Sequence, residues 1–326
     1  MKIWLRLMMG LLIALSVTLP AWAEDVDTVM MLRGDYVGVG AINVPTFSKS
    51  PLFGYLMDFF RTDARVKQAF DEIQAAGLVP EKVVKRIVVG VPTDVEKSEH
   101  ILLWETSEDL SKYHAIFMSH ANVFDIRKHQ DVEYFATKRE NECLALLGNL
   151  LVLGSELRVK EIIESHKTNF HKGPKRSGLL SEMKRTDKAK DAWFVWALDS
   201  KEQQQIGRSD PLVDMTQNGL GTLKMGEIRS GTVTLDFSSG LKTYAYIGMV
   251  SEATASQTAN LLMAMLQNWA NDADIKELGL EAFMTGVTFS AQKSDVRMNI
   301  DYDQSKFDQL IALVTQFAKS LQVPKK

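Results

Sequence analysis

The six histidines are the first residues to test for chemistry, because imidazole is the commonest metal ligand among side chains. All of them lie within the first 171 residues: His100, His114, His120, His129, His166 and His171. None forms the H-x-H or H-E-x-x-H spacing that places two imidazoles on one strand or helix face. His114 falls on the apolar side of a predicted helix, where a hydrogen-bonded core histidine is the commoner arrangement. The spacing therefore predicts no metal ligand and no cofactor.

Patterns typical of catalytic sites are incomplete in this sequence. Around Ser155 the chain reads LGSELR, which has only the first glycine of the G-x-S-x-G turn that presents a nucleophilic serine. Residues 219–226 lack the Gly-Lys-Ser/Thr ending of a phosphate loop, and residues 301–305 lack the glycine and glutamate of a calcium loop. No catalytic residue is predicted, which favours a protein that is not an enzyme. The alternative is a hydrolase whose acid and base carboxylates converge from distant positions among the 41 acidic residues.

Residues 1–23 have the features of a secretory signal peptide. Two basic residues precede an apolar run over 7–19, which is too short for a membrane-spanning helix of roughly 18 residues or more. Ala21 and Ala23 then occupy the −3 and −1 positions, where signal peptidase requires small side chains. Cleavage after Ala23 would leave a periplasmic or secreted protein, whereas the alternative is an uncleaved N-terminal anchor.

Composition restricts the partners of the exported chain. The lone Cys143 excludes an intramolecular disulfide and an N-terminal lipid anchor. Residues 1–23 hold two of the 38 basic residues and no acidic ones, so the mature chain carries 36 basic against 41 acidic residues, or −5. That balance argues against a nucleic-acid partner, which favours a strongly basic domain. The apolar run 143–154 is too short to span a bilayer, so no transmembrane helix is expected after residue 23.

The first half of the chain predicts alternating strands and amphipathic helices. Polar capping residues in front of apolar residues at helical spacing mark the helix starts, and Pro51 suits a first helical turn. Strands are expected over 28–41, 84–92, 100–106, 132–140 and 142–154. Helices are expected from Pro51, over 63–76, from Thr106–Asp109, and from Ser155 with Val159, Ile162, Ile163 and His166 on one stripe.

The second half repeats this order of elements. Strands are expected over 192–199, 231–239, 241–250, 282–292 and 295–303, with helices from Ser251 and from Phe307 to Leu321. The segment with Pro211 and Leu212 matches the one with Pro51 and Leu52. We therefore expect an α+β fold of two similar modules, 24–166 and 190–326, each with amphipathic helices packed on a mostly antiparallel sheet. The alternative is that two ordinary α+β stretches share common capping residues by coincidence.

A basic segment separates the two predicted modules. Residues 167–191 hold eight Lys and Arg against three Asp and Glu, and residues 167–189 are expected to be a linker or a short exposed helix. A more specific hypothesis is contact with an anionic surface such as phospholipid headgroups. The residues that would make this contact are Lys172, Lys175, Arg176, Lys184 and Arg185.

Two apolar features of the second half could belong to a binding surface. Trp193, Phe194 and Trp196 share one strand, and methionines are spread over the strands and helices that follow: Met249, Met263, Met265, Met284 and Met298. Methionine adapts to irregular ligands and aromatic rings contribute much interface energy, although core packing is the simpler explanation. These features favour an exported, non-catalytic envelope protein that binds or scaffolds a partner, either a protein or a lipid.

The chain also resembles a loosely defined class of exported bacterial proteins of unknown function with tandem α+β modules. The resemblance rests on TVMMLRGDYVGVG, KSPLFGYL, RIVVGVP, LLWETSEDL and LALLGNLLVLGSELRVKEII, which cover about the first half. It implies the fold and the compartment, and it carries no catalytic residues.

Overall fold

The computed structural model describes residues 27–54, 80–93, 100–119, 124–138, 142–169, 171–209 and 225–321. It divides into two compact units, residues 1–181 (unit 1) and residues 182–326 (unit 2), and each is described by itself. Both combine helices with antiparallel strands, which confirms the predicted α+β class. The predicted signal peptide with Ala21 and Ala23, the helix over 63–76, and Pro211 lie outside the described residues.

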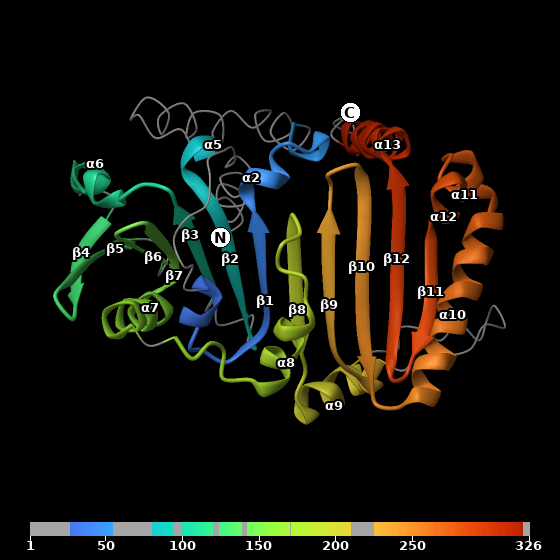
Figure 1. The fold of residues 1–326 in the computed structure, drawn as a ribbon, viewed down its shortest axis with the longest axis horizontal. Helices are drawn as coiled ribbons and strands as arrows, with labels where there is room; N and C mark the ends of the chain where they lie inside the picture. The colour runs from blue at the N-terminus through green and yellow to red at the C-terminus, as the bar shows by residue number, and fades with distance from the viewer. Residues whose placement is uncertain are drawn as a thin grey trace. The chain divides into compact units, whose positions relative to one another are not determined.

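Unit 1 contains a seven-stranded antiparallel arrangement in the order β1-β2-β3-β7-β6-β5-β4 (Figure 1). The last strand of unit 1, β7, pairs with the third strand, β3. Strands β6, β5 and β4 continue the sheet on the other side of β7. The strands are β1 (Tyr36–Asn43), β2 (Val84–Pro92), β3 (Ile101–Thr106), β4 (Phe124–His129), β5 (Val132–Thr137), β6 (Glu142–Leu147) and β7 (Leu150–Ser155). The helices are η1 (Thr28–Met31), α2 (Val44–Phe47), α5 (Pro80–Val83), η3 (Leu110–Tyr113), α6 (His114–Ser119) and α7 (Glu156–Thr168).

Alternation along these strands gives unit 1 two apolar sheet faces. On one face, Val159, Ile162 and Ile163 of α7 are fully or almost fully buried. On the other face, a cluster forms around Trp104 and consists of Val44, Val84, Ile87, Leu102, Trp104 and Leu153. Ser155 begins α7 as predicted, because its hydroxyl accepts a hydrogen bond from the Arg158 backbone N–H.

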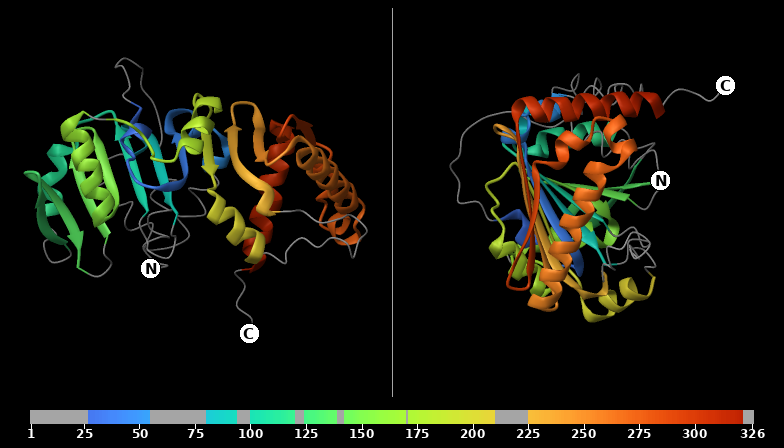
Figure 2. Two further views of the ribbon diagram at one scale, coloured as in Figure 1. Left: turned by 90° about the horizontal axis from the view of Figure 1, so that it is seen from below. Right: turned by 90° about the vertical axis from the view of Figure 1, so that its right-hand side faces the viewer.

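Unit 2 contains five antiparallel strands in the order β8-β9-β10-β12-β11 (Figure 1). They are β8 (Ala192–Ala197), β9 (Ile228–Asp236), β10 (Gly240–Met249), β11 (Val287–Gln292) and β12 (Asp295–Asp303). The helices are α9 (Ser200–Ser209), η5 (Met225–Glu227), α10 (Glu252–Asn271), α11 (Ala273–Glu277), α12 (Glu281–Met284) and α13 (Gln304–Leu321). Helix α10 lies along one face of the strands, as the right-hand view of Figure 2 shows. Helix α8 (Ser177–Arg185) runs across the division between the units.

Three sequence predictions for unit 1 are wrong in detail. The expected strand over 28–41 begins only at Tyr36, because residues 28–31 form a 3-10 turn that buries Val29. The expected strand over 142–154 is a hairpin, since Gly148 adopts a left-handed φ of 61° and turns the chain. His166, which was placed on the buried stripe of α7, is exposed.

Two further differences between the prediction and the structure concern strand β4 and the start of the helical segment after β3. Strand β4, with the sequence FDIRKH, was not predicted, because its exposed and charged side chains lack the alternation of a half-buried strand. The helical segment after β3 begins at Asp109, whose carboxylate accepts from the Ser111 N–H at 2.8 Å. The Thr106 hydroxyl, which was expected to cap it, instead donates to the carbonyls of Glu108 and Asn149.

Gly240 provides a test of the β9–β10 hairpin. Its φ of 126° lies in a region that only glycine adopts readily, and a Cβ there would lie 2.0 Å from the Tyr302 carbonyl oxygen. We expect Gly240→Ala to destabilise unit 2 by more than about 2 kcal/mol, because backbone strain and a clash with a backbone atom add. Denaturant titration followed by circular dichroism measures the change.

Gly279→Ala is the matched control, because Gly279 also has a positive φ of 68°, but a Cβ added there would meet no atom within 4 Å. It should cost only about 1 kcal/mol. Equal losses in the two variants would contradict the role assigned to the Tyr302 carbonyl.

Candidate apolar binding face

The aromatic residues of β8 divide between the two faces of the unit 2 sheet. Trp193 and Val195 are 3% and 0% exposed and share one face. Phe194 and Trp196 point to the opposite face and are only partly buried, with their rings stacked at a centroid distance of 6.2 Å. Alternation along the strand accounts for this division, and only one side of the strand is sealed.

Neighbouring strands extend the face that carries Phe194 and Trp196. In the pairing register, Phe194 lies opposite Val233, and Trp196 lies opposite Gly231. The indole ring of Trp196 covers this glycine so closely that a Cβ at position 231 would lie 2.1 Å from it. We define the apolar face as the partly buried side chains of Phe194, Trp196, Val233, Leu235, Met298 and Ile300.

Helix α10 covers one part of this side of the sheet. Ala255 and Ala259 of the helix pack against Met249 and Val296 of the strands, and all four are almost fully buried. At the neighbouring edge, the Phe289 N–H of β11 donates to the Met263 sulfur of α10 at 3.2 Å. The residues of the apolar face retain partial exposure, so this surface is the strongest candidate for binding an apolar ligand.

The methionines singled out in the sequence have different environments. Met249 and Met265 belong to the core, whereas Met263, Met284 and Met298 are partly buried. The sequence analysis missed Val233, Leu235 and Ile300 as members of the face. Alternation within β9 and β12 was the signal that could have identified them.

The basic residues predicted to contact an anionic surface are separated by the structure into two groups. Lys172, Lys175 and Arg176 belong to unit 1, and Arg176 pairs with Asp35 at 3.2 Å and donates to the Thr93 hydroxyl. Lys172 and Lys175 are exposed.

The other two predicted residues, Lys184 and Arg185, form the end of α8. Arg185 bonds to the carboxylates of Asp295 and Glu182, and Lys184 is exposed. The helix also has a buried side with Leu179, Glu182 and Met183. Contact of these residues with an anionic surface stays a prediction.

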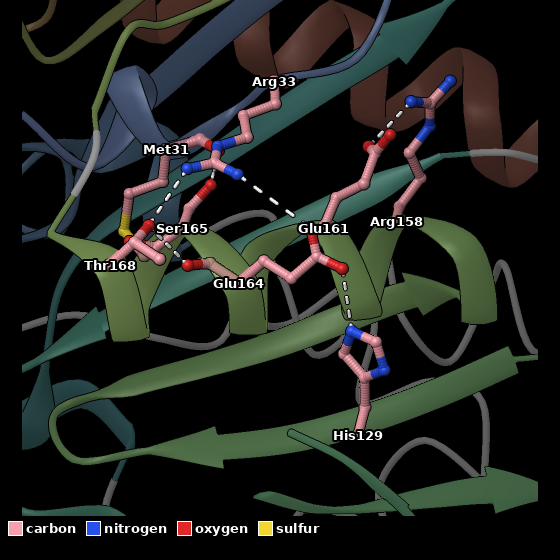
Figure 3. A network of polar contacts seen from close by, with 8 residues as sticks. All are labelled: Met31, Arg33, His129, Arg158, Glu161, Glu164, Ser165 and Thr168. Atoms are coloured by element: carbon pink, nitrogen blue, oxygen red, sulfur yellow. Dashed lines mark hydrogen bonds and ion pairs between the residues drawn. The ribbon is translucent and has the colours of Figure 1, made fainter.

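Polar side chains of α7 bond to Met31 and Arg33, which precede β1 in unit 1 (Figure 3). Glu164 accepts from His129 at 2.9 Å and lies 4.0 Å from Arg33, whose guanidinium also donates to the Thr168 hydroxyl. The Ser165 hydroxyl donates to the Met31 carbonyl. Figure 3 shows that His129 reaches the helix from β4, so the network links three separate elements. Its contacts hold Met31, Arg33 and His129 against α7.

Two features of the described ranges bear on metal binding and on thiol chemistry. These ranges contain no group of three or more His, Cys, Asp or Glu side chains that could hold a metal ion. Burial raises the pKa of Cys143 to about 11, which keeps the thiol protonated at neutral pH.

Hydrogen bonds lower the pKa of several carboxyl groups. The donors are Lys112 for Glu108, the Ser111 backbone for Asp109, Lys160 for Glu156 and Lys190 for Asp236. A general acid needs the opposite shift, so these four groups do not favour the hydrolase alternative.

Comparison with known proteins gives a likeness of fold only. No protein-family model matches the chain, and no curated protein matches it. Among solved structures, crystal form IV of TP0453 matches with a TM-score of 0.50 and 8% identity, covering 90% of this chain and 98% of that one. Crystal forms III and I of TP0453 give TM-scores of 0.49 and 0.47, also at 8% identity and 90% coverage of this chain, with 100% and 99% of those chains covered. In the part of the chain that the structure describes, no helix is both long and apolar enough to cross a bilayer.

The contribution of the Asp236 carboxylate to the stability of unit 2 can be tested by changing the pH. Hydrogen bonds from Lys190 and Ser238 lower its pKa from 3.8 to about 2. Because the folded-state pKa is depressed, its contribution is present above about pH 4 and is lost as the pH falls towards 2. We expect Asp236→Asn to cost about 2 kcal/mol at pH 7 and almost nothing near pH 2.

Denaturant titrations of both proteins at the two pH values give this difference. Asp301→Asn, at an exposed position on the same sheet, is the control variant. A constant deficit for Asp236→Asn at both pH values would mean that the charge of Asp236 is not its stabilising feature.

Proposed function

We propose that this protein is an exported envelope protein that binds a hydrophobic ligand on the apolar face of unit 2 without catalysing a reaction. The observation that carries the proposal is the partial exposure of the stacked Phe194 and Trp196 rings among other apolar side chains. A ligand surface needs such rings within reach of the ligand, and partial exposure meets this condition. Export is supported by the sequence features of residues 1–23.

We further propose that the two units derive from one duplicated module. The strand order β1-β2-β3-β7-β6 of unit 1 corresponds to β8-β9-β10-β12-β11 of unit 2, with the last strand returning to the third in both. The residue that ends the last strand also caps the following helix in both units. Ser155 accepts from the N–H three residues later, and so does Asp303, at 2.8 Å. The hairpin of β4 and β5 is then an addition to unit 1, and TP0453 in crystal form IV supports no more than the fold.

A second candidate function is reversible contact with an anionic lipid surface. It is supported by the exposure of Lys172, Lys175 and Lys184. A basic residue near an anionic membrane contributes about 1 kcal/mol, and the attraction is screened over about 8 Å at physiological salt. Three lysines therefore suffice for weak binding at low salt only.

Export predicts a defined mature N-terminus. N-terminal sequencing of the protein from the periplasm or the medium should begin at Glu24, because Ala21 and Ala23 mark the cleavage site. A membrane-bound protein that retains Trp4 would contradict export with cleavage.

Ligand binding predicts that an apolar molecule accompanies the purified protein. Native mass spectrometry of the mature wild-type protein should show a bound species, and Trp196→Ala should lose most of it because the largest side chain of the apolar face is removed. Trp269→Ala is the control, since Trp269 is 48% exposed on α10 and does not belong to the face. Equal retention in both variants, or no bound species in the wild type, would contradict the proposal.

Attraction between the exposed lysines and an anionic lipid surface predicts vesicle binding that depends on the salt concentration and on the charge of the lipid. The wild type should co-sediment with phosphatidylglycerol vesicles at low salt and be released at physiological salt, with no binding to phosphatidylcholine. The variant Lys172→Glu/Lys175→Glu/Lys184→Glu should not bind. A control with the same change of charge at the exposed Lys201, Lys276 and Lys293 should bind as the wild type does. Identical behaviour of the two triple variants would refute this contact.

A further inference from the structure

The face of the unit 2 sheet opposite the apolar face carries a grid of polar and aromatic side chains. Pairing places Tyr244 beside Asn299 and Tyr246 beside Arg297. On β11, Thr288 lies opposite Asn299 and Ser290 lies opposite Arg297. On β10, Lys242 lies opposite Asp301. We call this set the tyrosine face: Lys242, Tyr244 and Tyr246 of β10, Arg297, Asn299 and Asp301 of β12, and Thr288 and Ser290 of β11.

This face is accessible within unit 2. Tyr244 is 39% exposed, and the side chains of Asn299, Asp301, Thr288 and Ser290 are exposed as well. Helix α10 packs on the other side of these strands, against Val296 and its neighbours. Figure 2 shows α10 on one side of the strands only. The tyrosine face therefore presents an aromatic ring and several hydrogen-bonding groups to solvent.

Two arginine side chains lie near the Tyr246 ring, and only one of them forms an ion pair within the described residues. Arg185 and Arg297 lie with their guanidinium carbons 5.7 and 5.3 Å from the centre of the Tyr246 ring. Arg185 is paired with Asp295, whereas Arg297 has no ion pair within the described residues, and its Nε atom is buried there without a hydrogen-bond acceptor. Stacking on the ring holds the Arg297 guanidinium in place, so it is preorganised for an anionic group from outside.

A chain of acidic sugars matches this combination. The apolar side of a sugar ring packs on an exposed aromatic ring, as at Tyr244. The Asn299 amide and the Ser290 hydroxyl can both donate to and accept from sugar hydroxyls, and the Asp301 carboxylate can accept from them. A guanidinium binds a carboxylate through two parallel hydrogen bonds, which is the role open to Arg297. We propose that the tyrosine face binds an acidic polysaccharide, independently of the hydrophobic ligand on the opposite face.

Other occupants fit the face less well. A simple anion would need Arg297 and Lys242 but not an exposed ring. A neutral sugar chain would use Tyr244 but leave the guanidinium of Arg297 without a counter-charge. A solvated face with no ligand is common in antiparallel sheets, and the experiment must be able to return that result.

Isothermal titration of the mature protein with three soluble probes separates these cases. Hexagalacturonate supplies both sugar rings and carboxylates, cellohexaose supplies the rings alone, and hexaglutamate supplies the carboxylates alone. We expect saturable binding of hexagalacturonate, with affinity for the other two at least tenfold weaker. Equal binding of hexagalacturonate and hexaglutamate, or no binding of any probe, would overturn the proposal.

Variants assign the binding to the face. Tyr244→Ala and Arg297→Gln should each weaken hexagalacturonate binding about tenfold, whereas Tyr244→Phe should retain most of the affinity because it keeps the ring. Arg229→Gln is the control for lost positive charge, since Arg229 is exposed on β9 and is not a member of the tyrosine face. Thermal melts confirm folding of every variant. Unchanged affinity in both Tyr244→Ala and Arg297→Gln would refute the site, and the hydrophobic ligand of the opposite face should be retained in all of them.

Discussion

The pairing of the last strand of each unit with the third one is the constraint on which the rest of the structure depends. In unit 1 this pair is β3 with β7, and in unit 2 it is β10 with β12. Each pair joins segments far apart in the sequence, so forming it requires the closure of a long intervening loop. Once it is formed, the following helix must start at the end of the last strand, where Ser155 or Asp303 satisfies a free N–H.

Two-residue alternation then decides which side chains each sheet face of unit 2 presents. On β12, Val296, Met298 and Ile300 all point to one side, and Arg297 and Asn299 point to the other. A slip of one residue in the pairing with β10 would exchange these sets and expose the apolar side chains on the wrong side. The same register thus separates an apolar side, partly covered by α10, from a polar side with an exposed tyrosine.

Features encoded by neighbouring residues were predictable from the sequence. The caps at Ser155 and Ser251 and the boundaries of β2 follow from local capping and alternation, and the structure confirms them. Features that depend on distant residues were not predictable. Arg185 looked like a solvent-exposed cation in a basic segment, but Asp295, which lies 110 positions away, bonds to it. The tyrosine face was missed for the same reason, because Tyr246 and Arg297 become neighbours only through strand pairing.

The central claim is that the apolar face of unit 2 is a ligand surface and not a loosely packed core. Methyl NMR of the methionine-labelled mature protein tests it directly, using palmitate below its micellar concentration as the probe. Met298 lies on the face, whereas Met249 is 1% exposed and packs beneath α10. The account predicts a saturable shift of the Met298 signal while the Met249 signal stays in place. No shift of Met298 at saturating palmitate, or equal shifts of both signals, would contradict it.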